Sequence, residues 1–109
     1  MSSQEPVGAV DFGYLEDFAA GDRRVVGEVL ALFLEQAGAW SASLDPAAPG
    51  WRDLIHTMKG ASRGVGAFRL GDACASAETE GPSATPAVRA ALEAAAGEIS
   101  AYLARGQSA

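Results

Sequence analysis

The sequence predicts an all-α protein, an antiparallel four-helix bundle with a short additional helix at its N-terminal end. Apolar residues recur at spacings of three and four along most of the 109-residue chain, which is the period of an amphipathic helix. Clusters of proline and glycine divide the chain into segments of helical length, and no run of alternating β-branched residues indicates a strand. Four amphipathic helices with short connections bury their apolar stripes best as an antiparallel bundle.

Capping residues define the first two expected helices. Asp11 caps a short helix that ends near Ala19, and Asp22 caps a long helix that continues to about Leu44. One face of the long helix should belong to the core, because its apolar residues recur with the helical period. They are Val25, Val29, Leu32, Phe33, Trp40 and Leu44.

The segment "LDPAAPG" ends the long helix and separates it from three further elements. We expect a helix from 51 to 63, ending at "GVG", and another from 67 to about 80. Thr85 as N-cap and Pro86 at the first helical position indicate the start of the last helix. This helix should fray near Arg105.

The length of the chain suits a single domain. We expect a flexible N-terminus over residues 1–10, one helical bundle domain over residues 11–105, and a flexible C-terminus over residues 106–109.

Composition excludes several functional classes. A net charge of −6 argues against nucleic acid and anionic membranes as partners, since both need a dominant basic surface. One cysteine, Cys74, and one histidine, His56, are too few for a disulfide or a common zinc site, so no metal is expected. No basic residue precedes Arg23, and no apolar run has the length of a signal peptide or a membrane span, so we expect a cytoplasmic protein.

The only histidine lies on the polar side of the third expected helix. Drawn as a helix, this segment places Trp51, Leu54, Ile55, Met58 and Ser62 along its apolar side. The opposite side carries Arg52, His56, Lys59, Gly60 and Arg63. Alone, His56 is an ordinary surface histidine. Its neighbours Lys59 and Gly60, however, put an ammonium group and a gap beside the ring.

The surroundings of His56 are basic although the chain is acidic. Four cations lie between residues 52 and 69, against one anion, Asp53. The cations are Arg52, Lys59, Arg63 and Arg69. Such a surface suits a phosphoryl group or an acidic site on another protein.

The segment "HTMKGASRGVGAFRLGDACASAE" resembles the signature of histidine-containing phosphotransfer (HPt) domains, and "GDRRVVGEVLALFLEQAGAW" resembles the long helix that precedes it in that family. The resemblance extends from Asp11 to about Leu103. It implies an intermediate of a two-component phosphorelay, which has no kinase activity of its own.

In this family, His56 would accept a phosphoryl group from an aspartate of a receiver domain, or from a hybrid histidine kinase, and pass it to another response regulator. Lys59 would stabilise the phosphoryl oxygens, and Glu78 would orient the histidine ring. The partner would dock on Arg52, Gly60, Arg63, Gly64 and Arg69. The resemblance implies no cofactor in this chain, because the receiver domain would supply the Mg²⁺. We also expect the protein to be a monomer.

Two other functional classes stay open at this stage. The same fold can serve as a helical interaction or dimerisation module, or as an inhibitor that docks on a kinase, without chemistry at His56. A thiol enzyme using Cys74 and His56 is the other alternative, although the spacing of Cys74 with Leu70 and Ala77 is that of a core residue.

Overall fold

The structure, a computed structural model, describes residues 8–108 of the chain. Its elements are α1 (Phe12–Phe18), α2 (Arg23–Ser43), α3 (Trp51–Gly64), α4 (Phe68–Glu80), the 3₁₀ turn η2 (Pro82–Ala84) and α5 (Thr85–Ser108). The flexible ends expected from the sequence include residues 1–7 and Ala109, which lie outside the described residues.

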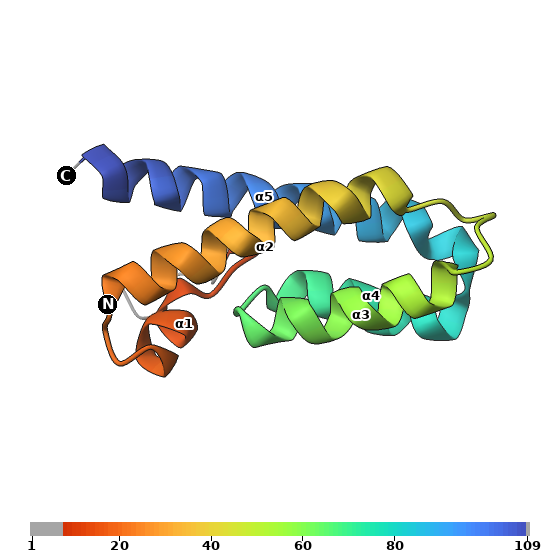
Figure 1. Cartoon of the computed structure of the whole chain (residues 1–109). Coiled ribbons are helices and arrows are strands. Elements are labelled where there is room, and N and C mark those ends of the chain that lie inside the picture. Colours follow the sequence, from red (N-terminus) through yellow and green to blue (C-terminus); the bar gives the residue numbers. More distant parts are fainter. Residues whose placement is uncertain (1–7, 109) are drawn as a thin grey trace.

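Helices α2 to α5 form a four-helix bundle in which each helix runs antiparallel to the one before it (Figure 1). α3 packs mainly against α4, while α2 and α4 both pack against α5. The short α1 packs against α2 at the end of the bundle where α2 begins (Figure 1). The predicted fold class is confirmed. Within residues 8–108, no helix combines the length and apolar character needed to cross a membrane.

Both aspartate caps predicted from the sequence are present. The carboxylate of Asp11 accepts a hydrogen bond from the backbone N–H of Tyr14 at 3.1 Å. That of Asp22 accepts from the N–H groups of Arg24 at 3.0 Å and Val25 at 3.2 Å. These bonds satisfy backbone donors that have no partner inside the helix.

The predicted role of Thr85 as N-cap of the last helix is wrong. The turn η2 precedes it, so that its backbone is already helical. Its hydroxyl serves a tertiary contact instead: it donates to the Pro82 carbonyl at 2.7 Å and accepts from the indole Nε1–H of Trp51 at 2.9 Å. The bond ties the start of α3 to the start of α5.

The predicted core face of α2 is partly wrong. Val25 is 40% exposed and Leu32 is 57% exposed. The buried positions of α2 follow spacings of four and three on a neighbouring face; they are Val26, Leu30, Phe33, Ala37 and Trp40. The segment "VVGEVLALFL" is apolar on two adjacent faces. Periodicity therefore does not decide which face is buried, whereas packing against α5 and α3 does.

The expected flexible N-terminus is wrong for Ala9 and Val10, which are buried. Their backbone N–H groups donate to the carboxylate of Glu98 on α5 at 2.8 and 3.0 Å. The next residue, Asp11, donates its N–H to the carbonyl of Gly66 at 2.8 Å. Gly66 has φ +89, and a Cβ there would lie 2.7 Å from the Asp11 carbonyl oxygen. The contact therefore requires glycine at this turn.

The last helix also differs from the prediction, because α5 runs to Ser108 and not to Arg105. Gly106 is the only strong helix-weakening residue in this stretch. One glycine costs about 1 kcal/mol relative to alanine, which weakens a helix without ending it.

Candidate functional site

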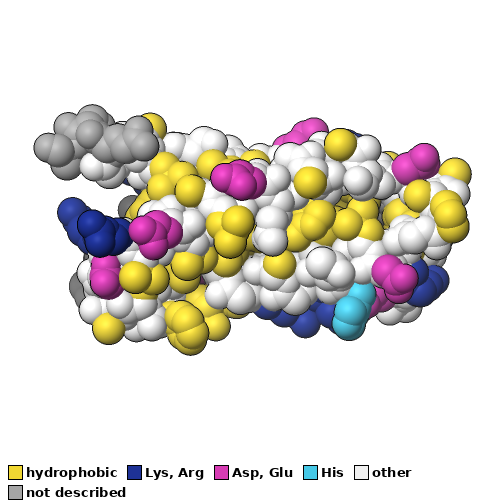
Figure 2. All heavy atoms as spheres, viewed as in Figure 1, with side chains coloured by type: hydrophobic (Ala, Val, Ile, Leu, Met, Phe, Trp, Pro, Cys, Tyr) yellow, Lys and Arg dark blue, Asp and Glu magenta, His cyan; other side chains and the backbone are white. Residues whose placement is uncertain are grey.

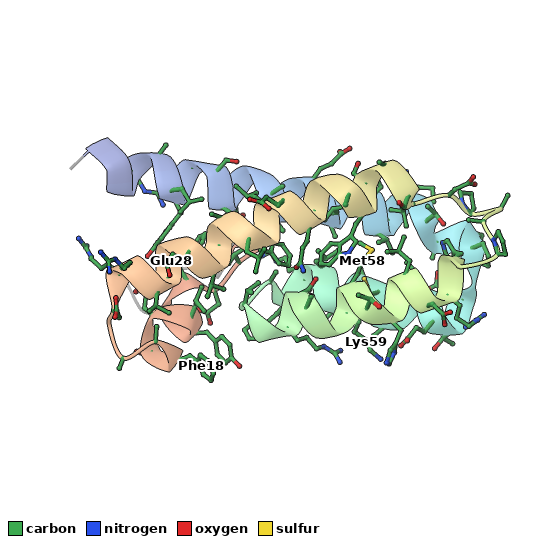
Figure 3. The ribbon with its side chains drawn as sticks, in the orientation of Figure 1. Phe18, Glu28, Met58 and Lys59 are labelled. Atoms are coloured by element: carbon green, nitrogen blue, oxygen red, sulfur yellow. The ribbon has the colours of Figure 1, made fainter. Side chains whose placement is uncertain are left out.

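The site begins with the two sides of α3. Met58 and Lys59 are adjacent in sequence and point to opposite sides of the helix, Met58 into the bundle and Lys59 outward (Figure 3). Met58 and Ile55 are fully buried. The His56 side chain is 74% exposed. Burial of the apolar stripe thus orients the helix so that the histidine faces solvent.

Figure 2 shows this histidine at the lower edge of the molecule, with Lys and Arg side chains beside it. Carboxylates lie close by on the same edge. The ring is therefore accessible to a second protein. Positively and negatively charged side chains both lie near it.

Three side chains of α3 bond to a single residue of α4, Glu78. The Nδ1 atom of His56 lies 3.0 Å from Glu78 Oε2. The ammonium group of Lys59 donates to Glu78 Oε1 at 2.6 Å. The guanidinium of Arg52 donates through Nη1 to the backbone carbonyl of Glu78 at 2.9 Å.

The family resemblance implied the contact between His56 and Glu78, but nothing in the sequence analysis predicted the two cation contacts. Arg52, His56 and Lys59 are spaced by four and three residues, so they form one stripe on α3. That spacing was a visible signal that the three could share a partner. The register of α4 against α3 decides which residue the partner is, and periodicity carries no information about it.

Small side chains on α4 allow the two helices to approach. Ala67 and Cys74 are fully buried, and Gly71 is buried between them. A Cβ at Gly71 would lie 2.8 Å from Cγ of Arg63. The stem of Arg63 therefore occupies the space that a side chain at position 71 would need, and the close packing brings Glu78 within reach of α3.

The charges at the site fix the roles of the ring nitrogens. The hydrogen bond from Lys59, and next the one from His56, hold the pKa of Glu78 below its ordinary value of 4.5. At neutral pH Glu78 is thus a carboxylate without a proton to donate. Nδ1 of His56 must then be the donor in the 3.0 Å contact. In the neutral imidazole this leaves the lone pair on Nε2.

The other residues singled out from the sequence lie further along this surface. Gly60 and Gly64 are exposed, and a Cβ on either would meet nothing within 4 Å. Arg63 lies 3.8 Å from the carboxylate of Asp72. Arg69 is exposed in the first turn of α4. The structure therefore groups Arg52 with the histidine and leaves the other four residues as a flanking surface.

Cys74 does not belong to this exposed site. It is fully buried. Burial, and then the charge of Glu78, raises the pKa of its thiol to about 11, so at neutral pH it is protonated and unreactive. Both observations argue against the thiol-enzyme alternative. Among residues 8–108, no three histidine, cysteine or acidic side chains are grouped as metal ligands would be.

One cavity of the described residues lies far from the histidine. It has a volume of about 600 Å³ and lies where α2 begins and α5 ends, at the opposite end of the bundle from α3's first turns (Figure 1). Its walls include Arg23, Glu28, Tyr102 and Arg105. None of the residues that line this cavity belongs to α3 or α4, and His56 lies on the open surface of the bundle.

The chain is similar to known proteins in both sequence and structure. The family model described as Hpt domain matches residues 28–102. The crystal structure of the histidine phosphotransferase ShpA from Caulobacter crescentus is 56% identical in sequence and superimposes with a TM-score of 0.82. The match covers 93% of this chain and 95% of that one. A search of curated proteins gave no match.

Proposed function

Since this chain belongs to the Hpt domain family, we propose that it is a phosphorelay intermediate that carries the phosphoryl group on Nε2 of His56. One observation carries the proposal: an exposed histidine whose Nδ1 lies 3.0 Å from a carboxylate. That bond selects the tautomer in which Nε2 has the lone pair, and it restrains the ring.

The transfer step uses this lone pair. Nε2 attacks the phosphorus of an aspartyl phosphate on a receiver domain, a P–N bond forms, and the P–O bond to the aspartate breaks. The aspartate leaves as a carboxylate, and the receiver domain would supply the Mg²⁺ that neutralises charge on the phosphoryl oxygens. The ring keeps its Nδ1 proton and becomes cationic, a charge that the carboxylate of Glu78 stabilises. The reverse step passes the group to another receiver.

Lys59 is the second group with a proposed role. Its side chain is only 22% exposed and its ammonium group is held by Glu78 at 2.6 Å. A phosphoryl group on His56 brings a second anion to this ammonium group. Lys59 then stabilises the phosphorylated histidine by charge while it stays bonded to Glu78, a fixed arrangement that needs little reorganisation during transfer.

Docking is proposed to occur along the exposed face of α3 beyond the histidine. Gly60 and Gly64 leave open gaps on this face, so the backbone of a receiver can approach closely at these two positions. Arg63 and Arg69 flank it with positive charge that complements an acidic receiver site. We propose that one chain binds one receiver, as a monomer.

The test is transfer from phosphorylated receivers. Incubation of the protein with a panel of receiver domains from the same source, each carrying labelled phosphate on its aspartate, should move the label to this chain with at least one of them. The label should be acid-labile and base-stable, as expected for phosphohistidine. The variant His56→Gln should keep its helicity and accept none; acid-stable label, or equal labelling of His56→Gln, would refute the proposal.

A further inference from the structure

The cation Arg52 is bonded to the residue that orients the histidine. Its Nη1 donates to the backbone carbonyl of Glu78 at 2.9 Å, although the sequence suggested a docking role for it. We propose that Arg52 is a positioning residue for His56, which acts by fixing the last turn of α4 so that the Glu78 carboxylate meets the ring. This inference rests on the proposed function for its consequence in phosphotransfer, but not for its geometry.

The Glu78 carbonyl that Arg52 binds has no hydrogen-bond donor within α4. Glu78 lies in the last turn of α4 (Phe68–Glu80), where carbonyl groups have no intrahelical donor. That last turn contains no basic residue of its own. A guanidinium from outside therefore supplies both a charge-assisted hydrogen bond and a positive charge at the negative end of the helix dipole.

The antiparallel arrangement explains why Arg52 can do this. Because α3 and α4 run in opposite directions, the start of α3 lies beside the end of α4 (Figure 1). Arg52 precedes His56 by four residues and Lys59 by seven, so all three project from one stripe. Arg52 holds the backbone of Glu78, and the other two hold its two carboxylate oxygens.

The base of Arg52 is itself firmly held. The preceding residue, Trp51, is buried and donates its indole N–H to the Thr85 hydroxyl at 2.9 Å. The Arg52 guanidinium lies 5.9 Å from the centre of the Trp51 ring, within the range of a cation–π contact. Trp51 thus joins the start of α3 to the start of α5. Arg52 joins the start of α3 to the end of α4 and restrains the backbone of Glu78.

The experiment compares two cation-removing substitutions on the same face. Arg52→Met removes the donor but keeps an unbranched side chain over Trp51. Arg63→Met removes a cation with no bond to Glu78. The readout is the tautomer of the His56 ring in the unphosphorylated protein, from its ¹⁵N chemical shifts at one fixed neutral pH. We expect the share of the Nδ1–H form to fall in Arg52→Met and to stay unchanged in Arg63→Met.

Phosphotransfer from a receiver gives the second readout. Arg52→Met should slow it by about fivefold, the size expected when one hydrogen-bonded contact is loosened, and Arg52→Lys, which keeps the charge and one donor, should restore part of both readouts. An unchanged tautomer in Arg52→Met overturns the inference, and slower transfer with an unchanged tautomer means that Arg52 only docks the partner. If Arg52→Met does not fold, Arg52→Lys decides by the same tautomer measurement. If the wild type transfers to no receiver, the tautomer still tests this inference while the proposed function fails.

Discussion

Glu78 accepts from His56 with one carboxylate oxygen and from Lys59 with the other, at 3.0 and 2.6 Å. The carboxylate bonded to the histidine ring is therefore also the counter-ion of the Lys59 ammonium group. Any change at Glu78 alters ring orientation and local charge together, and suitable variants separate the two effects.

Glu78→Gln keeps an acceptor for Nδ1 of His56 but removes the negative charge. Glu78→Ala removes both, so that the ring is free to rotate. We expect Glu78→Gln to change the rate of phosphotransfer by no more than about threefold and Glu78→Ala to lower it by about tenfold or more, because orientation contributes most to such a step. Single-turnover transfer from a phosphorylated receiver measures both. Equal rates for Ala and Gln would show that ring orientation is unimportant.

Replacement of Gly60 by a bulky residue tests the docking surface. A Cβ at Gly60 meets nothing within 4 Å, so Gly60→Gln should fold normally and gain about 0.5 kcal/mol of helix stability. Transfer from the receiver should nevertheless slow by about tenfold or more, because the side chain blocks close approach. Gly97→Gln on α5 is the matched control, since Gly97 is also an exposed, open helical position. Similar transfer rates for the two variants would place docking elsewhere.

The pH dependence of stability tests the bonds to Glu78. Its pKa is lowered on folding from 4.5, first by Lys59 and then by His56. A carboxyl group of this kind contributes stability that is fully present above its unfolded pKa and disappears as the pH falls through the folded value. Urea unfolding should therefore show Glu78→Gln to be less stable than the wild type at about pH 7, with the difference vanishing toward about pH 2.

The control for this titration is Glu80→Gln, which changes an exposed carboxylate in the same turn. It carries neither of the two side-chain bonds that Glu78 makes, so its effect should vary little over the same pH range. A stability difference for Glu78→Gln that persists at low pH would contradict the role of these bonds.

The thiol of Cys74 should be inert in the folded protein. It is fully buried, and burial raises its pKa to about 11, so both access and thiolate content are low. Alkylation should be more than about tenfold slower in buffer than in denaturant. A Ser76→Cys substitution in a Cys74→Ala background places a thiol on the exposed side of the same helix and should react quickly. Fast native alkylation of Cys74 itself would mean that α4 opens readily.

Glu98 anchors the segment before α1. Glu98→Ala would leave the buried N–H groups of Ala9 and Val10 without acceptors, which costs about 1–3 kcal/mol in the free energy of unfolding. Glu93→Ala, at an exposed position of the same helix, should change stability by no more than about 0.5 kcal/mol. Urea unfolding compares them, and equal stabilities would show that the segment is not anchored by Glu98.

Local features of the sequence determined much of this protein. The caps at Asp11 and Asp22, the breaks at proline and glycine, and the buried stripe of α3 depend on neighbours within a few residues, and they follow from the sequence. Burial of that stripe leaves His56 and Gly60 on the exposed side of α3. The resemblance to a known family then indicated which exposed residue is the proposed phosphoacceptor.

The tertiary structure decided what depends on distant partners. Whether Val25 or Val26 faces the core is set by how α2 packs in the bundle, because both faces are apolar. Thr85 follows η2 with helical backbone angles, and its hydroxyl accepts from the indole of Trp51 and does not cap its own helix. The meeting of Arg52, His56 and Lys59 at Glu78 depends on the register between two antiparallel helices. Side-chain periodicity predicts which face of a helix is apolar. The axial register between two helices, however, is decided by their packing.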